Sequence, residues 1–559
     1  MKFIHLLAAA MAISAVSCSE RVKVTADYQV VPLPQTITET AGEQAFVLNP
    51  DTRIVATDSS MTSNAELLAG YIARMNGFTP EITSDTPGDN YIILNANLDN
   101  VNKEAYEINV SSSHIAINGA SPAGTFYGIQ TIRKSIPGNS GNCDVVFSPA
   151  TISDAPRFSY RGAHFDSSRH FFDADSIKIF IDMLALHNIN HMHWHLTDDQ
   201  GWRVEINRRP ELTRTGSMRA GTIIGHGGPD NNSFDSIPYG GYYTQEQIRD
   251  IVDYASRRHI TIVPEIDLPG HMQAALASYP ELGCTGGPYE VWQRWGISDD
   301  VLCAGNDSIY AFIDDVLDEI TELFPSEYIH IGGDECPKVR WEKCPKCQAR
   351  IRQLGLRDNE HGTAEQQLQS HVMRHATEFL TQRGRKVIGW DEILEGGITP
   401  DAIVMSWRGT EGGKAAAEAG HDAIMTPSQY LYFDFVQSDD RESEPLGASW
   451  GDPVTVELVY SYEPVPENLT PEQAAHIIGV QANLWTEYVP TMRHAQYMEL
   501  PRLGALAEVQ WSNAAKDYPA FLQRLKRLAS IYDAEGYNYA RHAFETKNED
   551  CANETQTAQ

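Results

Sequence analysis

Basic residues are scarce in this chain of 559 residues. It has 43 Lys and Arg against 75 Asp and Glu, which gives a formal net charge of −32. Nucleic acids bind to basic grooves, and anionic lipid headgroups attract basic patches. The charge therefore argues against either as an electrostatic partner, and it favours a neutral substrate and good solubility.

Long apolar runs are also lacking, except near the N-terminus. There a Lys precedes an apolar stretch over residues 6–16, which is too short to span a bilayer. This pattern predicts a signal peptide over residues 1–17. Ala-Val-Ser before Cys18 is similar to a bacterial lipobox, and soluble export with an incidental Cys18 is the alternative. We predict an exported protein, lipid-anchored to a bacterial membrane (periplasm or cell surface) through a tether over 18–27.

Cysteine is sparse, with eight residues in all. Seven remain beyond the lipobox, and export permits disulfides. Cys284 and Cys303 could cross-link the loop between them. Cys336, Cys344 and Cys347 are close in sequence, and three such thiols could begin a zinc site. Because no fourth ligand follows at the usual spacing, we predict one disulfide in this group instead.

Residues 28–154 have the pattern of a small α+β domain. Residues 91–94 form a short apolar run, and residues 106–110 alternate in polarity, as a half-buried strand does. No cluster of catalytic residue types is found in this part. Further elements are predicted at 63–75, 114–117 and 123–136.

The region from 155 to 540 alternates strand-like runs with amphipathic helices, which indicates βα units around a parallel sheet. Eight such units predict an α/β fold, a (β/α)8 TIM barrel. A long loop over 429–468 follows the seventh strand in place of a helix, and residues 541–559 are a polar tail. The strand candidates begin near Tyr160, His191, Thr261, Tyr328, Lys386, Ala402, Asp422 and Ile477.

Residues 330–335 (His-Ile-Gly-Gly-Asp-Glu) carry the most informative chemistry. Side chains alternate between the faces of a strand, so Asp334 and Glu335 can enter one site only if the strand has ended. The two Gly permit that turn. When one of two neighbouring carboxylates ionises, the other keeps its proton to higher pH, as a proton-donating acid requires. A solvated loop and a cation site are the alternatives on these residues alone.

A TIM barrel has its active site at the C-terminal ends of its strands. Aromatic side chains there can stack on sugar rings, while Arg and carboxylates bind hydroxyls, so these ends predict a pocket for a neutral sugar. The residues placed there are Arg161, Asp166, His195, Asp198, Glu265, Asp267, His271, Asp334, Glu335, Trp390, Asp391, Trp407, Tyr432, Asp434, Trp485 and Glu487.

A metal site is the alternative for three His on one strand face, at 191, 193 and 195. We predict no metal, because His191 and His193 are expected to lie too deep in the strand to reach its end.

Together these motifs resemble glycoside hydrolase family 20, the β-N-acetylhexosaminidases. The resemblance spans residues 28 to 535, including the small domain that family members often carry in front. The segment around the Cys residues behind Glu335 and the loop around Trp450 depart from it. The matching motifs are 160–162 with Asp166 and 169–171, then 193–199, 264–271 and 330–335, and later Trp390, Trp407, Tyr432 with Asp434, and Trp485 with Glu487.

The resemblance implies exo-acting release of terminal N-acetylglucosamine or N-acetylgalactosamine from a glycan substrate, with retained configuration and no cofactor. Glu335 would be the general acid/base. Asp334 would orient the substrate's 2-acetamido group, whose carbonyl oxygen attacks the anomeric carbon, and Tyr432 would bind that carbonyl. The other roles are pocket walls for Trp390, Trp407 and Trp485, hydroxyl binding for Arg161, Asp434 and Glu487, and a relay to Glu335 for Asp198 and His271.

Three other functions remain open on the sequence. A related family activity could release a disaccharide, as a lacto-N-biosidase does, or a sulfated sugar. The His cluster would favour a metal-dependent barrel hydrolase. The third is a catalytically silent glycan-binding lipoprotein, against which the intact Asp334–Glu335 pair argues.

Overall fold

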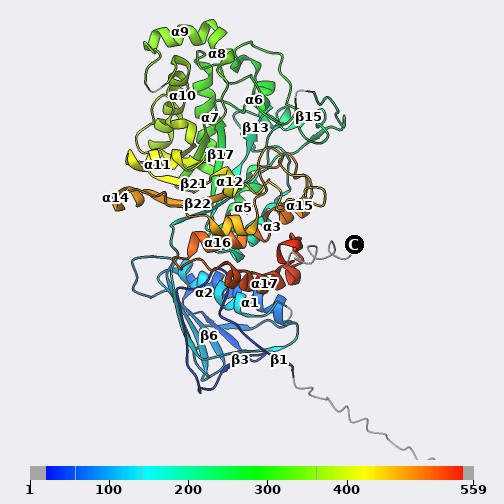
Figure 1. Ribbon diagram of the computed structural model, residues 1–559, viewed down its shortest axis with the longest axis vertical. Coiled ribbons are helices and arrows are strands. Elements are labelled where there is room, and N and C mark those ends of the chain that lie inside the picture. Colours follow the sequence, from blue (N-terminus) through cyan, green and yellow to red (C-terminus); the bar gives the residue numbers. More distant parts are fainter. Residues whose placement is uncertain (1–20, 57, 139, 229, 361, 546–559) are drawn as a thin grey trace, which may run out of the picture.

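The computed structural model covers both predicted domains (Figure 1). The predicted signal peptide, Cys18 and residues 546–559 lie outside the described residues. Within the described part, no helix is long and apolar enough to cross a membrane. The described ranges are 21–56, 58–138, 140–228, 230–360 and 362–545.

The N-terminal domain is a seven-stranded sheet with two helices beside it (Figure 1). Strands β6 (Tyr91–Asn95), β7 (Tyr106–Val110) and β8 (His114–Gly119) alternate between buried and less buried residues, as their polarity pattern requires. Helices α1 (Thr62–Asn76) and α2 (Pro122–Ser135) lie within one residue of the predicted bounds. The sheet order is β2 (Thr36–Glu39), β10 (Ala150–Asp154), β7, β8, β6, β4 (Arg53–Ala56) and β5 (Glu81–Thr83), and a second sheet contains β1 (Lys23–Thr25), β9 (Asp144–Phe147) and β3 (Phe46–Leu48).

Helix α2 is buried along nearly its whole length because it lies between this sheet and the C-terminal helix α17 (Tyr518–Glu535). Arg133 of α2 pairs with Glu535 at 2.6 Å. A Cβ atom on Gly138 would lie 2.1 Å from the backbone oxygen of Ser530. The small domain therefore packs directly against the last helix of the barrel domain.

Eight parallel strands close into a barrel, which confirms the predicted TIM fold. Each strand pairs with the next, and the last pairs with the first. All eight begin at the predicted residue or one residue after it. The strands are β11 (Tyr160–Asp166), β12 (His191–His195), β17 (Thr261–Leu268), β18 (Tyr328–Gly332), β19 (Lys386–Trp390), β20 (Ile403–Ser406), β21 (Ala423–Met425) and β22 (Ile477–Leu484).

The outer helices do not follow every strand. Only a short 3-10 turn, η3 (Asp391–Leu394), follows β19. After β22, helices α15 (Met492–Glu499) and α16 (Arg502–Trp511) are separated at Pro501, which cannot donate a backbone hydrogen bond. Besides α17, the barrel-domain helices of eight or more residues are α3 (Ala174–Leu186), α5 (Gln245–Ser256), α7 (Ser308–Leu323), α9 (Pro345–Leu354), α10 (Ala364–Thr381), α11 (Glu411–Glu418), α15 and α16. Shorter elements in the connections are β13 (Thr197–Asp198), β14 (Gly201–Trp202), α4 (Glu211–Arg214), β15 (Met218–Arg219), β16 (Tyr239–Gly240), α6 (Gln273–Ser278), η2 (Pro280–Leu282), α8 (Val339–Lys343), α12 (Ser428–Leu431), α13 (Val456–Ser461) and α14 (Pro471–Ala474), with η1 (Ser59–Met61) in the small domain.

The barrel interior has two layers below the C-terminal strand ends. The upper layer is polar: Glu265 lies 3.0 Å from both His193 and His330, and it accepts a hydrogen bond of 2.8 Å from Trp390 Nε1. This layer fixes the indole that closes the cavity above it. The lower layer is apolar and contains Tyr160, Val263, Ile388, Ile403, Met405 and Ile424.

Two segments that the sequence assigned to the tether and the tail contain regular structure. Residues 23–25, assigned to the tether, form β1 and pair in parallel with β9. Residues 541–544, assigned to the tail, form the 3-10 turn η4 (Arg541–Phe544), in which Arg541 pairs with Asp533. Neither segment has a local pattern that predicts structure; each is ordered by contacts with other parts of the chain.

The predicted disulfide is not formed, because all six described cysteines are free thiols. Helix α8 separates Cys336 from Cys344 and brings them to different neighbours. Cys336 packs against Gly270. Cys344 instead faces Cys303, which belongs to the connection after β17.

Candidate active site

The acid pair lies where β18 ends. Gly332 and Gly333 have φ values of 67° and 103°, so the strand stops and the backbone turns. A Cβ atom on Gly332 would lie 1.7 Å from Asp267 Oδ1, so only Gly fits there. Asp334 is 8% exposed, and the Glu335 side chain is 35% exposed. Both carboxylates reach one site, as their position after two Gly predicts.

His271 lies behind the pair and connects it to Asp198. Its Nε2 is 3.5 Å from Glu335 Oε2 and 3.7 Å from Asp334 Oδ2, and its Nδ1 is 3.1 Å from Asp198 Oδ1. Burial alone would lower the pKa of His271, but Asp198, Asp199 and Glu335 outweigh it and hold that pKa well above its usual value. Asp198 and His271 therefore lie behind the cavity, in contact with Glu335, which lines it.

Above the polar layer the barrel opens into a cavity of about 550 Å³. Trp390 and Trp485 lie at its deep end with ring centres 5.8 Å apart. Trp407 and Tyr432 are stacked on one side, with ring centres 6.1 Å apart and planes 17° from parallel. The predicted residues that line the cavity are Asp334, Glu335, Trp390, Trp407, Tyr432, Asp434, Trp485 and Glu487.

Two carboxylate oxygens in this cavity, Asp334 Oδ1 and Asp434 Oδ1, have no hydrogen-bond partner within the described ranges. Both side chains are buried. A buried carboxylate oxygen without a partner costs free energy, and a bound ligand removes that cost by donating to it. The cavity is therefore suited to a ligand that presents N–H and O–H groups.

The prediction for Arg161 is wrong. It lies near the start of β11, at the opposite end of the barrel, where it contacts Glu104 at 2.6 and 3.0 Å. The arginine of the cavity is Arg169, three residues after β11 ends. It pairs with Asp198 at 2.9 Å, and its guanidinium lies 4.8 Å from the ring centre of Trp485. Because the active site lies at the C-terminal ends of the strands, the arginine to choose from the sequence was the one that follows the strand, Arg169.

Sequence reasoning also missed the outer rim of the cavity. Trp295 and Tyr488 line it, as does Trp450, which is 63% exposed. Trp450 packs edge-on against Phe435 in the long loop after β21, with ring centres 4.6 Å apart. Its exposed ring is available to stack on a ligand that extends out of the cavity.

The His residues of β12 and β18 do not reach the cavity. His193 and His330 contact Glu265 beneath Trp390, and His191 lies deeper still, stacked on Tyr160 at 4.2 Å. None of these residues lines the cavity. An ion held by them would be separated from a bound ligand by the Trp390 ring, which disfavours the metal-dependent hydrolase.

Family models and relatives match nearly the whole chain. The catalytic domain of glycosyl hydrolase family 20 matches residues 158–514, and domain 2 of the same family matches residues 27–155. A β-hexosaminidase of Porphyromonas gingivalis is 41% identical over 542 residues, covering 94% of this chain and 67% of the relative. A β-N-acetylhexosaminidase of Cellulomonas fimi is 31% identical over 525 residues, covering 92% of this chain and 96% of the relative.

Solved structures agree with these matches. The family 20 β-N-acetylhexosaminidase of Streptomyces coelicolor A3(2) has a TM-score of 0.78 at 31% identity, covering 92% of this chain and 97% of that one. The family 20 exo-β-N-acetylglucosaminidase of Vibrio harveyi, in complex with N-acetylglucosamine, has a TM-score of 0.80 at 33% identity, covering 94% of this chain and 81% of that one. With these matches over both domains and the acid pair in its cavity, the chain belongs to glycosyl hydrolase family 20.

Proposed function

We propose that the protein is an exo-acting β-N-acetylhexosaminidase, which removes terminal N-acetylglucosamine or N-acetylgalactosamine from glycans. The observation that carries this proposal is the cavity in which Asp334 and Glu335 lie beside Tyr432 and the Trp side chains. Trp390 closes the deep end, so a glycan can enter only by its terminal sugar. The two unpaired carboxylate oxygens match the N–H and O–H groups of an N-acetylated sugar.

Hydrolysis would be substrate-assisted and would retain the anomeric configuration. The carbonyl oxygen of the 2-acetamido group bonds to the anomeric carbon while Glu335 gives its proton to the departing glycosidic oxygen. Asp334 accepts a hydrogen bond from the acetamido N–H, and Tyr432 donates one to the carbonyl oxygen. Water then attacks the anomeric carbon, Glu335 takes the proton of that water, and the cyclic intermediate opens.

A substrate panel tests this function. The purified protein would be assayed on chromogenic N-acetylglucosaminide, N-acetylgalactosaminide and plain glucoside, and on a chitin trisaccharide. We expect cleavage of the N-acetylated substrates, inertness of the glucoside, and release of single sugars from the non-reducing end. Comparable cleavage of the glucoside would contradict the assisted mechanism, and internal cleavage of the trisaccharide would contradict the exo mode.

The activity should fall as the pH rises through about 6. Burial raises the pKa of Asp334 to about 6; His271 opposes this effect, and the carboxylates of Glu265 and Glu335 add to it. The acid pair therefore retains one proton up to that pH. The reactive form carries this proton on Glu335 and a negative charge on Asp334, so its loss removes the acid.

The measurement is kcat/KM from about pH 4 to 8, which reports ionisations of the free enzyme. Asp334→Asn provides the control, because Asn does not titrate, so the descending limb should no longer lie near pH 6. A wild-type profile that rises through pH 6 and stays level to pH 8 would contradict this assignment.

Arg169, and not Arg161, should influence substrate affinity. Lys in place of Arg169 keeps the charge but loses the forked geometry that can bind a sugar hydroxyl while pairing with Asp198. We expect KM to rise and kcat/KM to fall about 10–100-fold, the equivalent of one hydrogen bond to a charged group.

Arg161→Lys is the matched control. It loses contacts to Glu104 and to the backbone oxygens of Phe158 and Asn188. The free energy of unfolding should decrease by about 1–3 kcal/mol while KM stays unchanged. Steady-state kinetics and denaturant unfolding of both variants separate the two roles, and a KM effect at Arg161 would reverse our assignment.

We further propose that Cys18 carries a lipid that holds the enzyme at a bacterial membrane. The support is the apolar stretch that ends in Ala-Val-Ser directly before this Cys. Cys18→Ala should leave kcat unchanged and move the protein from the membrane to the soluble fraction after cell fractionation. Unchanged membrane association of the variant would refute the anchor.

A further inference from the structure

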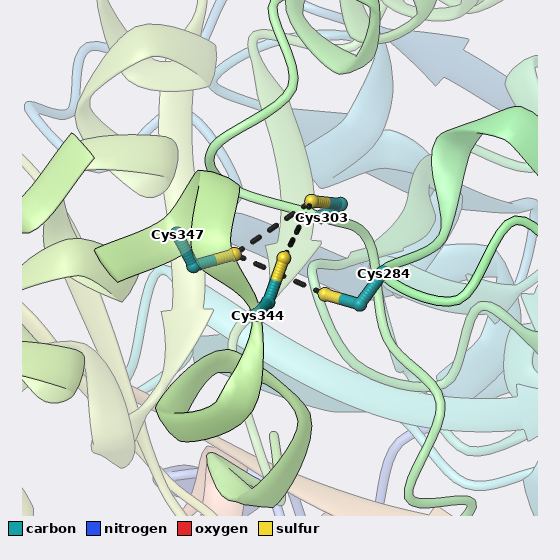
Figure 2. Close-up of side chains that lie close together, drawn as sticks. All are labelled: Cys284, Cys303, Cys344 and Cys347. Atoms are coloured by element: carbon teal, nitrogen blue, oxygen red, sulfur yellow. Dashed lines mark hydrogen bonds between the residues drawn. The ribbon is translucent and has the colours of Figure 1, made fainter. Parts of the chain in front are cut away.

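Four cysteines meet at one point outside the active site. Cys344 lies between α8 and α9, and Cys347 lies in the first turn of α9. Cys284 and Cys303 come from the connection between β17 and α7. Figure 2 shows the four sulfur atoms turned toward a common centre. Cys303, Cys344 and Cys347 are buried, and Cys284 is half-buried.

The sulfur spacing matches a tetrahedral metal site. Cys303 Sγ lies 3.7 Å from the Sγ atoms of both Cys344 and Cys347, and Cys284 Sγ lies 3.8 Å from that of Cys347. All four sulfurs lie within 4.8 Å of one another. Zn–S bonds of about 2.3 Å in a tetrahedron place the sulfurs about 3.8 Å apart, whereas a disulfide needs about 2.05 Å.

The local backbone also fits a thiolate cluster. Cys344-Pro-Lys-Cys347 has the two-residue spacing of a zinc ligand pair. The backbone N–H of Gly305 donates to the thiols of both Cys303 and Cys347, and hydrogen bonds of this kind to a ligating sulfur stabilise its bond to a metal. A Cβ atom on Gly305 would lie 2.2 Å from the backbone carbon of Lys346, so Gly is needed for this close approach.

We propose that Cys284, Cys303, Cys344 and Cys347 bind one Zn²⁺ ion as a structural tetrathiolate site. All four ligands come from protein, which is the closed arrangement of a structural zinc and leaves no position for substrate. None of the four lines the cavity that holds Glu335. The site is therefore independent of the proposed hydrolase chemistry.

The ion would join the two connections that carry the catalytic machinery. The connection after β17 contains His271, and Leu302 N beside Cys303 donates to Pro269 O at 3.1 Å. The connection after β18 contains Glu335, and Trp341 Nε1 before Cys344 donates to Leu302 O at 2.9 Å. Helices α8 and α9 lie at the end of the molecule farthest from the small domain (Figure 1). There the ion would replace the disulfide that the sequence pattern suggested.

Metal analysis of the full chain tests the proposal. The protein would be purified without chelator and its metals measured by mass spectrometry; we expect about one zinc per chain. Replacement by Co²⁺ should produce the intense sulfur-to-cobalt absorption of a tetrahedral tetrathiolate. Cys347→Ser should lose zinc and melt several degrees lower, whereas Cys336→Ser, at a buried cysteine outside the cluster, should retain the full zinc content.

Peptide mapping of the non-reduced protein tests the alternative that the four cysteines form disulfides. Zinc well below one per chain, together with cross-linked peptides joining Cys284 to Cys347 and Cys303 to Cys344, would overturn the proposal in favour of disulfides. Iron in place of zinc would overturn the choice of metal. If Cys347→Ser does not fold, zinc content, cobalt spectrum and peptide map of the wild-type chain still decide the question, and none of them depends on glycosidase activity.

Discussion

Glu335→Gln should lower turnover of a natural disaccharide by about 10²–10⁴-fold, the usual contribution of general acid/base catalysis. The amide keeps nearly the same size but cannot give a proton to the departing oxygen. An activated aryl glycoside has a leaving group that needs less protonation, so its cleavage should fall by a smaller factor. The comparison of both substrates in one variant separates the loss of an acid from general damage to the site.

Glu327→Gln is the matched control, because Glu327 immediately precedes the same strand at the opposite end of the barrel. There it pairs with Lys386, and both side chains are 56% exposed. We expect this variant to retain wild-type kinetics, because exposed ion pairs contribute little. Near-normal turnover of a disaccharide by Glu335→Gln would remove Glu335 from its catalytic role.

Asp334→Asn and Tyr432→Phe should each lower turnover by about 10²–10³-fold, the typical cost of removing one preorganised contact to developing charge. Asp334 would stabilise the positive charge that develops on the acetamido group, and the Tyr432 hydroxyl would orient its carbonyl. Both contacts strengthen as the ring closes, so kcat should fall more than binding of the product weakens. Tyr430→Phe is the control, because that ring stacks on Tyr462 at 4.9 Å and does not line the cavity.

A thiazoline mimic of the cyclic intermediate should inhibit the wild-type enzyme strongly and the Asp334→Asn variant weakly. This difference follows because the mimic presents to Asp334 the charge that the natural intermediate develops. The kinetics and the inhibition of the Asp334→Asn variant therefore report on the same interaction, that between Asp334 and the charge on the acetamido group. Trapping of a glycosyl group on a protein carboxylate would replace the assisted mechanism by a two-carboxylate scheme.

Strand positions in the barrel could be predicted from local pattern because barrel strands are short and buried on both faces. Strand β21, for example, consists of Ala, Ile and Met, and all three residues are buried. The acid pair could be predicted because two Gly before Asp334 permit the turn that its role needs. Strand β1 had no comparable signal, because it is only three residues long and its partner β9 lies more than 100 residues away.

The different positions of Arg161 and Arg169 in the barrel cannot be read from residue type. Arg161 is the second residue of β11, and Arg169 lies three residues after the strand ends, so the two side chains are at opposite ends of the barrel. Arg161 meets Glu104 of the small domain, and Arg169 meets Asp198 below the cavity. Only the position of the strand end distinguishes a structural ion pair from a group in the active site.

The order of the elements and the chemical character of the site could be predicted from the sequence alone, and the export signal stays a prediction. These properties depend on residues adjacent in the chain: periodicity, turn residues and the Asp334–Glu335 motif. The tertiary structure decided which distant groups meet, including the union of Cys284 and Cys303 with Cys344 and Cys347. Spacing along the chain cannot supply such contacts, because the four thiols lie in two separate connections, which the parallel pairing of β17 with β18 brings side by side.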